Sequence, residues 1–366
     1  MKYYCSNNSN IETSPIHRFP GNLSKTLKKL QPGDVCIIYS GVYIFNDTLN
    51  INCSGTKENK IQIIGEGDVE FDFSDMPYQD YCKENLNNGI NVYGNYLELK
   101  NISIKYSPFR GLQCFGHHNI FENIETSYNC DCGFMLYNGN NIVKKCYSHH
   151  NLDYRLYKDD KEHFGFNSDG FADKLFEGEG NEFIDCLSEY NGDDGFDFFQ
   201  RVNKSEKYTK LKNCIAQYNG LYEIDLSQNK RLLKDPTISK DVDLKAYHNY
   251  GNGMGFKLGG LRPENISIIL PTNNIQLDNC KSLYNRGCGF HQNKNTGKII
   301  LNNCEYIGNR EDFHFSSKHN IFQIIIENFN NPNANQIINC EDIDGITIKN
   351  SLIETNKLHK IKETSI

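Results

Sequence analysis

The feature that most constrains the fold is a spacing that recurs along most of the chain. A small or branched apolar residue, here called the anchor, is followed five positions later by asparagine in most copies. Successive anchors are separated by steps of 22, 22, 40, 28, 32, 34 and 24 residues. A minimum period near 22 with longer insertions is typical of a solenoid whose coils share one core and vary one loop. The eight anchors are Ile102, Ile124, Cys146, Cys186, Cys214, Ala246, Cys280 and Cys304.

A second apolar position recurs ten residues after the anchor. Its occupants are Leu112, Phe134, Leu156, Phe196, Ile224, Phe256 and Phe290, with His314 as the exception. Such stacks of Cys, Ile and Phe favour three short strands per coil, and the asparagines are expected at tight bends because asparagine tolerates left-handed backbone. The leucine pattern of leucine-rich repeats and the hairpin signals of a β-propeller are absent. The sequence therefore predicts an all-β chain folded as a parallel β-helix.

The predicted β-helix is a single domain, residues 1–366, with about ten coils. Residues 34–350 are expected to form the coils, and residues 351–366 a charged tail that frays or folds over the last coil. Residues 1–33 are expected to form an N-terminal cap segment. Within this segment, leucines at 23, 27 and 30 share one helical face, which predicts a short capping helix over 22–30.

Fourteen cysteines raise the question of disulfides or zinc, and their spacing argues against both. No pair has the two-residue gap of a zinc knuckle. Five cysteines are anchors, so they recur once per coil and are expected to be free thiols that face inward as small hydrophobes. These five are Cys146, Cys186, Cys214, Cys280 and Cys304.

Charge and the N-terminal sequence exclude some classes of partner. The net charge is −7 and no basic stripe interrupts the sequence, which excludes a nucleic-acid-binding protein. The first ten residues, MKYYCSNNSN, contain no apolar stretch long enough for a signal peptide or a membrane span. We therefore expect either an intracellular chain or one that has lost its targeting segment.

Four aspartates gather in two turns of similar sequence, about one repeat apart. The first turn reads SDGF at 168–171, and the second reads DDGFD at 193–197. A lone aspartate in such a chain is usually a turn residue that accepts hydrogen bonds from its own backbone. Four carboxylates within 29 residues, with no His or Cys ligand nearby, favour a hard cation. Calcium is the best match because it accepts many oxygen ligands in flexible geometry.

The position eleven residues after the anchor places Asp197 and Lys257 at equivalent points, two coils apart. Stacked strands are about 4.8 Å apart, so the two residues are expected on the order of 10 Å from each other. The insertions at 152–165 and 221–243 flank the aspartates, and we expect both to wall a groove there. In the first insertion, Tyr154, Arg155 and Tyr157 are candidates to contact an anionic sugar chain.

Taken together, these motifs resemble polysaccharide lyase family nine, whose members are pectate lyases on a right-handed parallel β-helix. The resemblance extends from Tyr3 to about Ser317. It rests on DGFA at 169–172, GNEF at 180–183, DDGFD at 193–197 and GFKLGG at 255–260. The resemblance implies that Lys257 is the Brønsted base and that four residues bind a catalytic Ca²⁺: Asp169, Asp193, Asp194 and Asp197.

Two departures from the family pattern concern the substrate rather than the ion. Phe196 stands where the family often has tryptophan, and His291 replaces a common acidic residue before Gln292 and Asn293. The candidate substrate contacts are Arg262, His291, Asn293, Tyr154 and Arg155.

Lys257 is preferred over Lys174 as the base, because Lys257 shares a column with Asp197 and precedes two glycines where a sugar chain could approach the backbone. Burial and a nearby dication are expected to lower the pKa of Lys257 from its usual value of about 10.4. Lys174 lies five residues after Asp169 and is expected to be a structural partner of the aspartates.

The predicted function is a pectate lyase that cleaves α-1,4-galacturonan by calcium-assisted β-elimination. Its expected partner is an acidic polysaccharide, with no nucleic acid and no membrane, and the chain is expected to act as a monomer. Because plant polymer is met outside the cell, secretion is expected.

Two alternative functions remain open at this point. An inverting polygalacturonase has Asn-Thr-Asp and Asp-Asp carboxylates that resemble residues 167–169 and 193–194. That class also needs a downstream Gly-His-Gly and an Arg-Ile-Lys, which this sequence lacks. In a non-catalytic, sugar-binding β-helix the aspartates would be ordinary turn residues.

Overall fold

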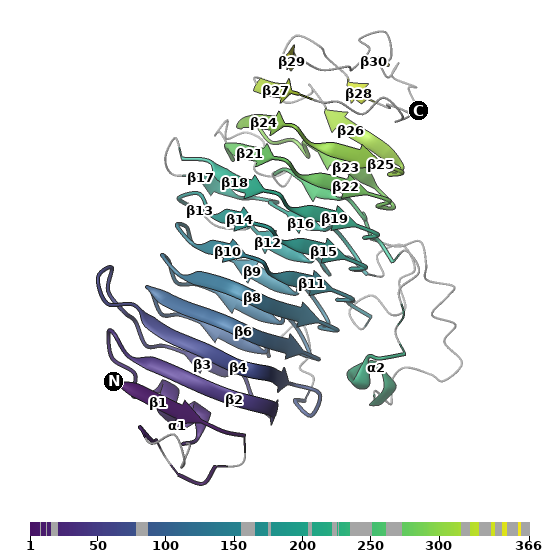
Figure 1. Ribbon diagram of the computed structural model, residues 1–366. Helices are drawn as coiled ribbons and strands as arrows, with labels where there is room; N and C mark the ends of the chain where they lie inside the picture. The colour runs from purple at the N-terminus through teal and green to yellow at the C-terminus, as the bar shows by residue number, and fades with distance from the viewer. Residues whose placement is uncertain are drawn as a thin grey trace.

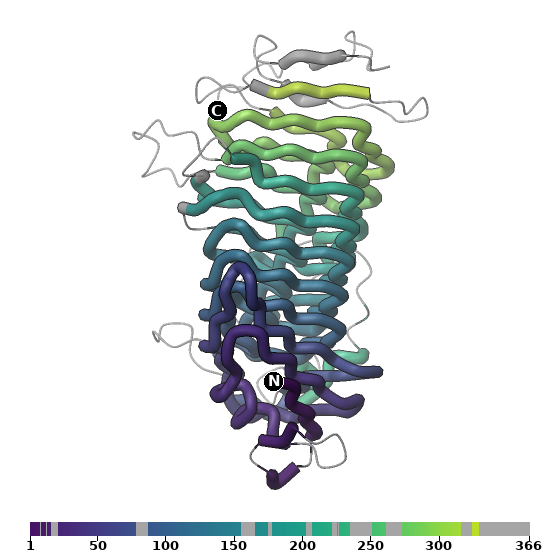
Figure 2. Tube along the Cα trace, turned by 60° about the vertical axis from the view of Figure 1, so that its left-hand side comes forward, coloured from purple at the N-terminus to yellow at the C-terminus, as the bar shows by residue number. Residues whose placement is uncertain are grey.

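In the computed structural model, the chain winds into an elongated stack of coils with its N-terminus at one end of the stack (Figures 1 and 2). Two long parallel sheets, here called sheet A and sheet B, run the length of the stack. The structure describes residues 1–7, 9–11, 13–15, 21–77, 87–154, 165–174, 177–203, 207–221, 225, 227–234, 251–260, 273–315, 323–328, 338–340, 346–349 and 358–359. The predicted parallel β-helix is confirmed.

Within the described residues, sheet A has seventeen strands, because most coils after the first few contribute two short strands to it. Its strands are β1 (Lys2–Cys5), β2 (Val35–Ile44), β4 (Ile61–Asp72), β6 (Leu97–Lys105), β8 (Ile120–Ser127), β10 (Ile142–Lys144), β11 (Tyr147–His149), β14 (Glu182–Ile184), β15 (Leu187–Glu189), β18 (Thr209–Lys212), β19 (Ile215–Gln217), β21 (Ile275–Asp278), β22 (Lys281–Leu283), β24 (Lys298–Asn302), β25 (Glu305–Ile307), β27 (Gln323–Glu327) and β29 (Ile346–Lys349).

In the part of the chain that the structure describes, sheet B has eleven strands, each from a separate coil. Its strands are β3 (Leu49–Ile51), β5 (Ile90–Val92), β7 (Leu112–Cys114), β9 (Phe134–Leu136), β12 (Phe171–Asp173), β16 (Phe196–Asp197), β20 (Phe256–Lys257), β23 (Cys288–His291), β26 (Glu311–Phe315), β28 (Ile338–Cys340) and β30 (Leu358–His359). A small third sheet pairs β13 (Glu177–Gly178) with β17 (Val202–Asn203), and the helices are α1 (Leu23–Leu27) and α2 (Lys230–Lys234).

The ends of the stack differ in detail from the predicted boundaries. Helix α1 is capped by Asn22, whose side chain accepts a hydrogen bond from the N–H of Lys25. Strand β1 lies within the predicted cap segment, yet it pairs with β2 and so begins sheet A. Strand β30 continues sheet B inside the predicted tail, and the rest of 351–366 lies outside the described residues. Within the described part of the chain, none of the helices has the length and apolar character needed to span a bilayer.

The five anchor cysteines are buried, unpaired thiols in the core, as predicted. From Cys146 onward the anchor separates the two short strands that each coil gives to sheet A. Behind sheet B, the rings of Phe171, Phe196 and Phe256 stack at centroid distances of 5.0 Å, which makes a continuous aromatic core. The small anchors and large rings therefore fill opposite sides of the interior.

The asparagines that follow the anchors form a buried hydrogen-bonded ladder. Each side-chain amide donates to the side-chain oxygen of the next coil, for example Asn151 to Asn191 at 2.8 Å and Asn191 to Asn219 at 3.0 Å. The prediction that these asparagines occupy the left-handed bend is wrong. Positive φ falls on the residue just before them, as at Tyr190 and Tyr218, and the asparagines are retained for their side-chain ladder instead.

Pairing in sheet B corrects the predicted register where loops differ in length. Phe171 lies opposite Phe134 and Phe196, so Phe171 takes the inward position expected for Leu156. Phe256 takes the position expected for Ile224, and Phe313, not His314, lies opposite Phe290. In each case an insertion or deletion between the anchor and the sheet B strand means that the inward residue is not the tenth after the anchor.

The largest correction brings Lys257 next to Asp197. These two residues lie opposite each other on the adjacent strands β16 and β20, one coil apart instead of two. Asn219 and Asn285 are 66 residues apart and hydrogen-bonded in neighbouring coils, so the whole interval is a single coil. This interval is three times the minimum period, so the sequence alignment wrongly divided it into two coils. The anchor assigned to the extra coil, Ala246, lies outside the described residues.

Candidate active site

The predicted site residues lie on the outer face of sheet B, where β12, β16 and β20 run side by side. Strand side chains alternate between faces, so Asp197 and Lys257 point outward because Phe196 and Phe256 fill the core. Asp169 and Asp194 each stand two residues before the inward phenylalanine of their strand.

Each of these aspartates is followed by a glycine that packs against the asparagine ladder. A Cβ at Gly170 would lie 2.0 Å from Ser188 Oγ, and a Cβ at Gly195 would lie 2.9 Å from Asn219 Nδ2. Only glycine can therefore occupy the position between the aspartate and the phenylalanine without a clash. The Asp-Gly-Phe motif thus combines an aspartate at the site, a close backbone contact and an inward ring.

Three carboxylates converge. One oxygen each from Asp169, Asp194 and Asp197 lies within 4.8 Å of the others, and all three residues are buried. A set of carboxylate oxygens without nitrogen or sulfur ligands fits a hard cation such as calcium better than zinc. The prediction that these three residues gather is confirmed.

Backbone amides hold the second oxygen of each carboxylate. Asp169 Oδ1 accepts from the N–H of Asp194 (3.2 Å), and Asp194 Oδ1 accepts from the N–H of Met254 (2.8 Å). Asp197 Oδ1 accepts from the N–H of Phe199 (2.8 Å). The three Oδ2 atoms are contacted instead by lysines, so they are the oxygens available to a bound cation.

Asp193 is placed differently from the other three aspartates. Its Oδ1 accepts from the N–H of Asn252 (2.6 Å), and its Oδ2 accepts from the N–H of Asn167 (2.9 Å). Asp193 therefore ties together the ends of the two insertions that flank the site. Its predicted role as a fourth metal ligand stays a prediction.

Two lysines, Lys174 buried and Lys257 partly exposed, neutralise part of the cluster. Lys174 Nζ lies 2.6 Å from Asp169 Oδ2 and 2.7 Å from Asp197 Oδ2. Lys257 Nζ lies 2.9 Å from Asp194 Oδ2 and 3.4 Å from Asp197 Oδ2, and 5.5 Å from the centroid of the Phe199 ring. Lys174 is thus the structural partner that the sequence predicts, and Lys257 is held less tightly.

Burial and crowding perturb the carboxylates. Burial raises the pKa of Asp169 to about 7; Lys174 opposes this increase, while Asp197 and Asp194 reinforce it. Burial together with Asp194 and Asp169 also raises the pKa of Asp193 well above its usual value. Such electrostatic stress is relieved by added positive charge, which again fits a cation site.

The pKa of Lys257 moves opposite to the direction expected for a site that holds a dication. Burial disfavours its charge, but Asp194, Asp197 and Asp193 outweigh burial and hold the pKa of Lys257 above its usual value. Its ammonium is therefore stabilised as long as these carboxylates keep their negative charge.

Two of the candidate substrate residues lie beside the lysine. His291 is opposite Lys257 on the adjacent strand β23, and its ring stacks on His314 at 4.5 Å. Burial, His314 and Lys257 lower the pKa of His291 to about 3, so its ring is neutral near pH 7. Asn293 donates to the carbonyl of Gly259 at 2.7 Å, beside the glycines that follow Lys257.

The remaining candidates are not brought to this face by the described structure. Tyr154 has no exposed surface in this conformation, and its role as a substrate contact stays a prediction. Its position at the base of a long insertion suggested exposure, whereas its ring is buried. Arg155, Tyr157 and Arg262 lie outside the described residues.

A buried ion pair behind the site was not predicted. Arg201 Nη1 lies 3.1 Å from Asp173 Oδ1, and neither side chain is exposed. The same guanidinium donates to the backbone carbonyls of Tyr137 and Glu179. Because Asp173 directly precedes Lys174, this pair fixes the strand from which Lys174 extends. Sequence spacing carried no signal for it, since the partners come from different coils.

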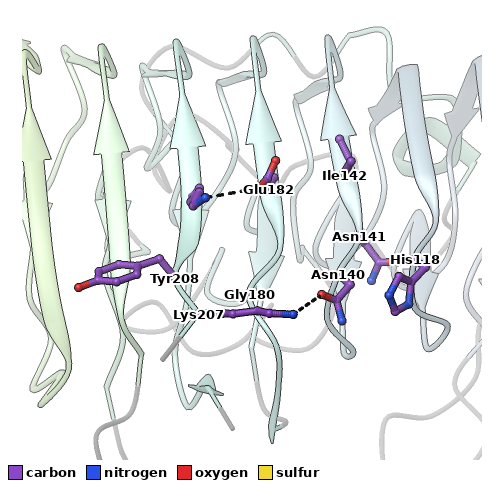
Figure 3. Close-up of a pocket in the computed structure, with 9 residues that line it drawn as sticks. His118, Asn140, Asn141, Ile142, Gly180, Glu182, Lys207 and Tyr208 are labelled. Atoms are coloured by element: carbon purple, nitrogen blue, oxygen red, sulfur yellow. Dashed lines mark hydrogen bonds and ion pairs between the residues drawn. The ribbon is translucent and has the colours of Figure 1, made fainter. Parts of the chain in front are cut away.

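A separate hollow lies away from the aspartates, beside sheet A (Figure 3). Its lining residues are His118, Asn140, Asn141, Ile142, Gly180, Glu182, Lys207, Tyr208 and Lys210. None of the predicted site residues is among them. The cluster on sheet B therefore remains the candidate active site.

Comparison with known proteins points the same way. The family model described as "Pel9A-like, right handed beta helix region" matches residues 3–335. A pectate lyase L from Paenibacillus polymyxa (strain SC2) is 27% identical over 335 residues, which cover 87% of this chain and 66% of that protein. A pectate lyase L from Dickeya chrysanthemi is 28% identical over 311 residues, covering 82% of this chain and 62% of that protein. The chain thus spans less than two thirds of the length of these relatives.

Solved structures agree on the fold. The crystal structure of pectate lyase Pel9A superimposes with a TM-score of 0.70 at 22% identity, covering 98% of this chain and 81% of that one. A rhamnogalacturonan lyase superimposes with a TM-score of 0.68 at 19% identity, covering 95% and 84%. The right-handed β-helix is therefore shared, and the chemistry must be argued from the site.

Proposed function

Because this chain belongs to the Pel9A-like right-handed β-helix family, we propose that it is a pectate lyase that cleaves polygalacturonate by calcium-assisted β-elimination. One observation carries the proposal. Lys257 lies beside a cluster of three converging carboxylates and opposite Asp197 on the adjacent strand. A base next to a cation site is the arrangement that removal of a proton adjacent to a carboxylate requires.

The proposed ion ligands are Asp169, Asp193, Asp194 and Asp197. When bound there, calcium would draw negative charge from a substrate carboxylate and make the proton on the neighbouring C5 carbon more acidic. The backbone N–H donors to Asp169, Asp194 and Asp197 keep these carboxylates in place, so their Oδ2 atoms stay gathered.

Lys257 is the proposed base. It removes the C5 proton, and the C–H electron pair forms the C4–C5 double bond. The C4–O bond breaks with its electron pair on the leaving glycosidic oxygen, which takes up a proton from solvent. To accept this proton, the lysine must first be neutral. Asp194 and Asp197 oppose neutralisation, so the amine becomes available once the charge of these carboxylates is compensated. Arginine could not replace it, because the guanidinium does not lose a proton at working pH.

His291 and Asn293 are the proposed substrate contacts. His291 lies next to Lys257 on β23, and its neutral ring offers a hydrogen bond without adding charge. Asn293 fixes the backbone at Gly259, the first of the two glycines after Leu258. The polymer is met outside the cell, so the proposal includes secretion.

The test is an assay on polygalacturonate with calcium present. Elimination produces a conjugated unsaturated chain end, so ultraviolet absorbance should rise in step with new reducing ends. Excess chelator should abolish both signals, and added calcium should restore them. Reducing ends without absorbance would indicate a hydrolase, and no cleavage would indicate a binding protein; either result contradicts the proposal. Rhamnogalacturonan, tested in parallel, distinguishes the two substrates named among the structural neighbours.

A further inference from the structure

We propose that Lys174 is a counter-charge that lowers the preference of the aspartate cluster for trivalent over divalent cations. The inference rests on the proposed function, since it concerns the ion that assists the reaction. It goes beyond that function because it gives a specific role to a residue that is neither the base nor a ligand.

The first argument is the position of the ammonium group. Lys174 follows β12 directly, and its side chain is about 10% exposed. Its Nζ lies between Asp169 Oδ2 and Asp197 Oδ2, at 2.6 and 2.7 Å. These are two of the three oxygens left available to an ion. Lys174 therefore shares oxygens with the cation site, and among the described residues its ion pairs are with these two aspartates.

The second argument is that both groups can use the same oxygens. A carboxylate oxygen has two lone pairs, so it can accept a hydrogen bond from an ammonium group and also face a metal ion. The second oxygens of Asp169 and Asp197 are already occupied by backbone N–H donors. Lys174 can thus stay in contact with the carboxylates while an ion is held, and its charge acts on that ion at close range.

The third argument is the charge of the ammonium group. Asp169, Asp194 and Asp197 converge, and Lys174 and Lys257 bring two positive charges to them. An ion held by these carboxylates lies close to the fixed charge of Lys174, and Coulomb repulsion grows with the charge of the ion, so a trivalent ion is opposed more than a divalent one. Without Lys174 this additional repulsion of a trivalent ion is lost. At a few ångströms, one unit of charge is enough to change ion preference by about tenfold or more.

A purely structural role of Lys174 would lead to a different result. If Lys174 only filled space or paired with Asp169, its replacement would lower stability and would affect the binding of all ions alike. Selectivity between ions of different charge separates the two roles. Such a measurement needs no substrate and no turnover.

The experiment measures binding of Ca²⁺ and Tb³⁺ by calorimetry to the full chain and to variants of stepped charge. Asp169→Asn removes one negative charge from the site, and Lys174→Met removes one positive charge. We expect the ratio of Tb³⁺ to Ca²⁺ affinity to rise from Asp169→Asn to wild type to Lys174→Met, by at least about tenfold at the last step. Lys174→Arg keeps the charge and should keep the wild-type ratio.

Two further variants keep the test decisive. The double variant Asp169→Asn with Lys174→Met removes both members of a buried pair, which costs less stability than stranding one charge. Its ratio should exceed that of Asp169→Asn by about tenfold, so the comparison stands even if Lys174→Met alone does not fold. Lys281→Met removes an exposed lysine that pairs with Glu305 at 2.8 Å on sheet A, and it should leave the ratio unchanged.

The outcomes separate this inference from the proposed function. An unchanged ratio in Lys174→Met, or in the double variant relative to Asp169→Asn, overturns the role of Lys174 and leaves the lyase proposal standing. A wild-type chain that binds neither ion overturns the role of Lys174 together with the calcium dependence of the proposed reaction. A stepped rise in the ratio supports the inference.

Discussion

Asp197 is the carboxylate that both lysines of the candidate site contact. Lys174 reaches its Oδ2 at 2.7 Å and Lys257 reaches the same atom at 3.4 Å. Although burial opposes its ionisation, the two ammonium groups hold the pKa of Asp197 below its usual value. The longer contact of Lys257, together with its place beside His291, supports the proposal that Lys257 rather than Lys174 is the base.

Replacing Lys257 by alanine should lower kcat on polygalacturonate by about 10²- to 10⁴-fold, the usual contribution of a general base. Lys257→Arg should be nearly as inactive, because arginine keeps the positive charge but cannot lose its proton. Calcium binding, measured by calorimetry, should persist in both variants. More than about a tenth of wild-type kcat in Lys257→Ala would rule this lysine out as the base.

The aspartates of the site could be predicted from the sequence, because Asp-Gly-Phe recurs one repeat apart and brings equivalent positions together. For Lys174, the sequence predicts a structural role beside the aspartates but not which two carboxylates it contacts. The geometry of these contacts depends on how Asp169 and Asp197 stack across coils. The burial of Tyr154 could not be predicted, because a tyrosine at the start of a long insertion can be either buried or exposed.

His150 should make stability depend on pH. Its ring stands between Tyr128 and Tyr190, at 5.2 and 5.3 Å. Burial and His149 lower its pKa from 6.5 to about 4, against the weaker opposing effects of Glu189 and Asp225. Between pH 6.5 and 4 the unfolded chain therefore binds a proton that the folded chain does not, and the folded state loses stability as pH falls through this range.

Substitution His150→Tyr tests this, since tyrosine already occupies the neighbouring positions with the same positive φ. In urea unfolding, the variant should lose less stability than wild type between pH 6.5 and 4, by up to about 1.4 kcal/mol per pH unit. Above pH 7 the difference between the two proteins should be constant. Parallel stability curves across the whole range would show that His150 titrates normally in the folded protein.

At the scale of the element, the asparagine ladder holds successive coils in register. Asn191 donates to Asn219 and to Ser188, and its oxygen accepts from Asn151. Asn191→Ala would leave several of these buried groups unpaired, at about 1–3 kcal/mol each. We expect the free energy of unfolding to fall by about 3 kcal/mol or more, measured by urea denaturation.

A matched control comes from a partly buried asparagine outside the ladder. Asn302 donates to Asp278 at 3.0 Å on the outer face of sheet A, where water can replace the lost partner. Asn302→Ala should therefore cost less than about 1 kcal/mol. Equal losses in the two variants would mean that the buried ladder contributes no more than a surface hydrogen bond.

The order of elements shows where sequence reasoning succeeds and where it fails. Coils of 22 residues could be aligned because each position repeats at a fixed step. The coil from Cys214 to Cys280 could not, because its insertion is about as long as two coils and supplied a false anchor at Ala246. The resulting error moved Lys257 one coil too far from Asp197. Only strand pairing, which depends on long-range hydrogen bonds, resolves such an ambiguity.

At the scale of the whole molecule, each coil pairs with its immediate neighbours, and one helix departs from this pattern. Helix α2 belongs to the insertion of the Cys214 coil, yet it lies against the N-terminal coils (Figure 1). The insertion was expected to wall the groove, but this described part of it reaches several coils away. The other end returns to the aspartates, where Asn252 donates to Asp193. The insertion therefore connects the candidate site with the distant end of the stack.

Arg231 is the main attachment of α2. Its guanidinium is buried and donates to the backbone carbonyls of Tyr106 at 2.7 Å, Phe73 at 2.6 Å and Met76. Lys230 adds an ion pair with Asp72 at 2.9 Å. A five-residue helix is not stable alone, so α2 depends on these contacts.

Arg231→Met should therefore release α2 without unfolding the coils. Methionine keeps much of the side-chain volume but donates to none of the three carbonyls, which water can reach once the helix detaches. Amide hydrogen exchange over residues 230–234 should become at least about tenfold faster, while the exchange of core strands β16 and β20 stays slow. Leu233→Ala, at an exposed position of the same helix, should change neither. Because a stack of coils is stabilised mainly between neighbours, the main urea midpoint should hardly move. If that midpoint instead falls together with the protection of α2, the helix is part of the cooperative unit, and the insertion then stabilises the coils that it spans.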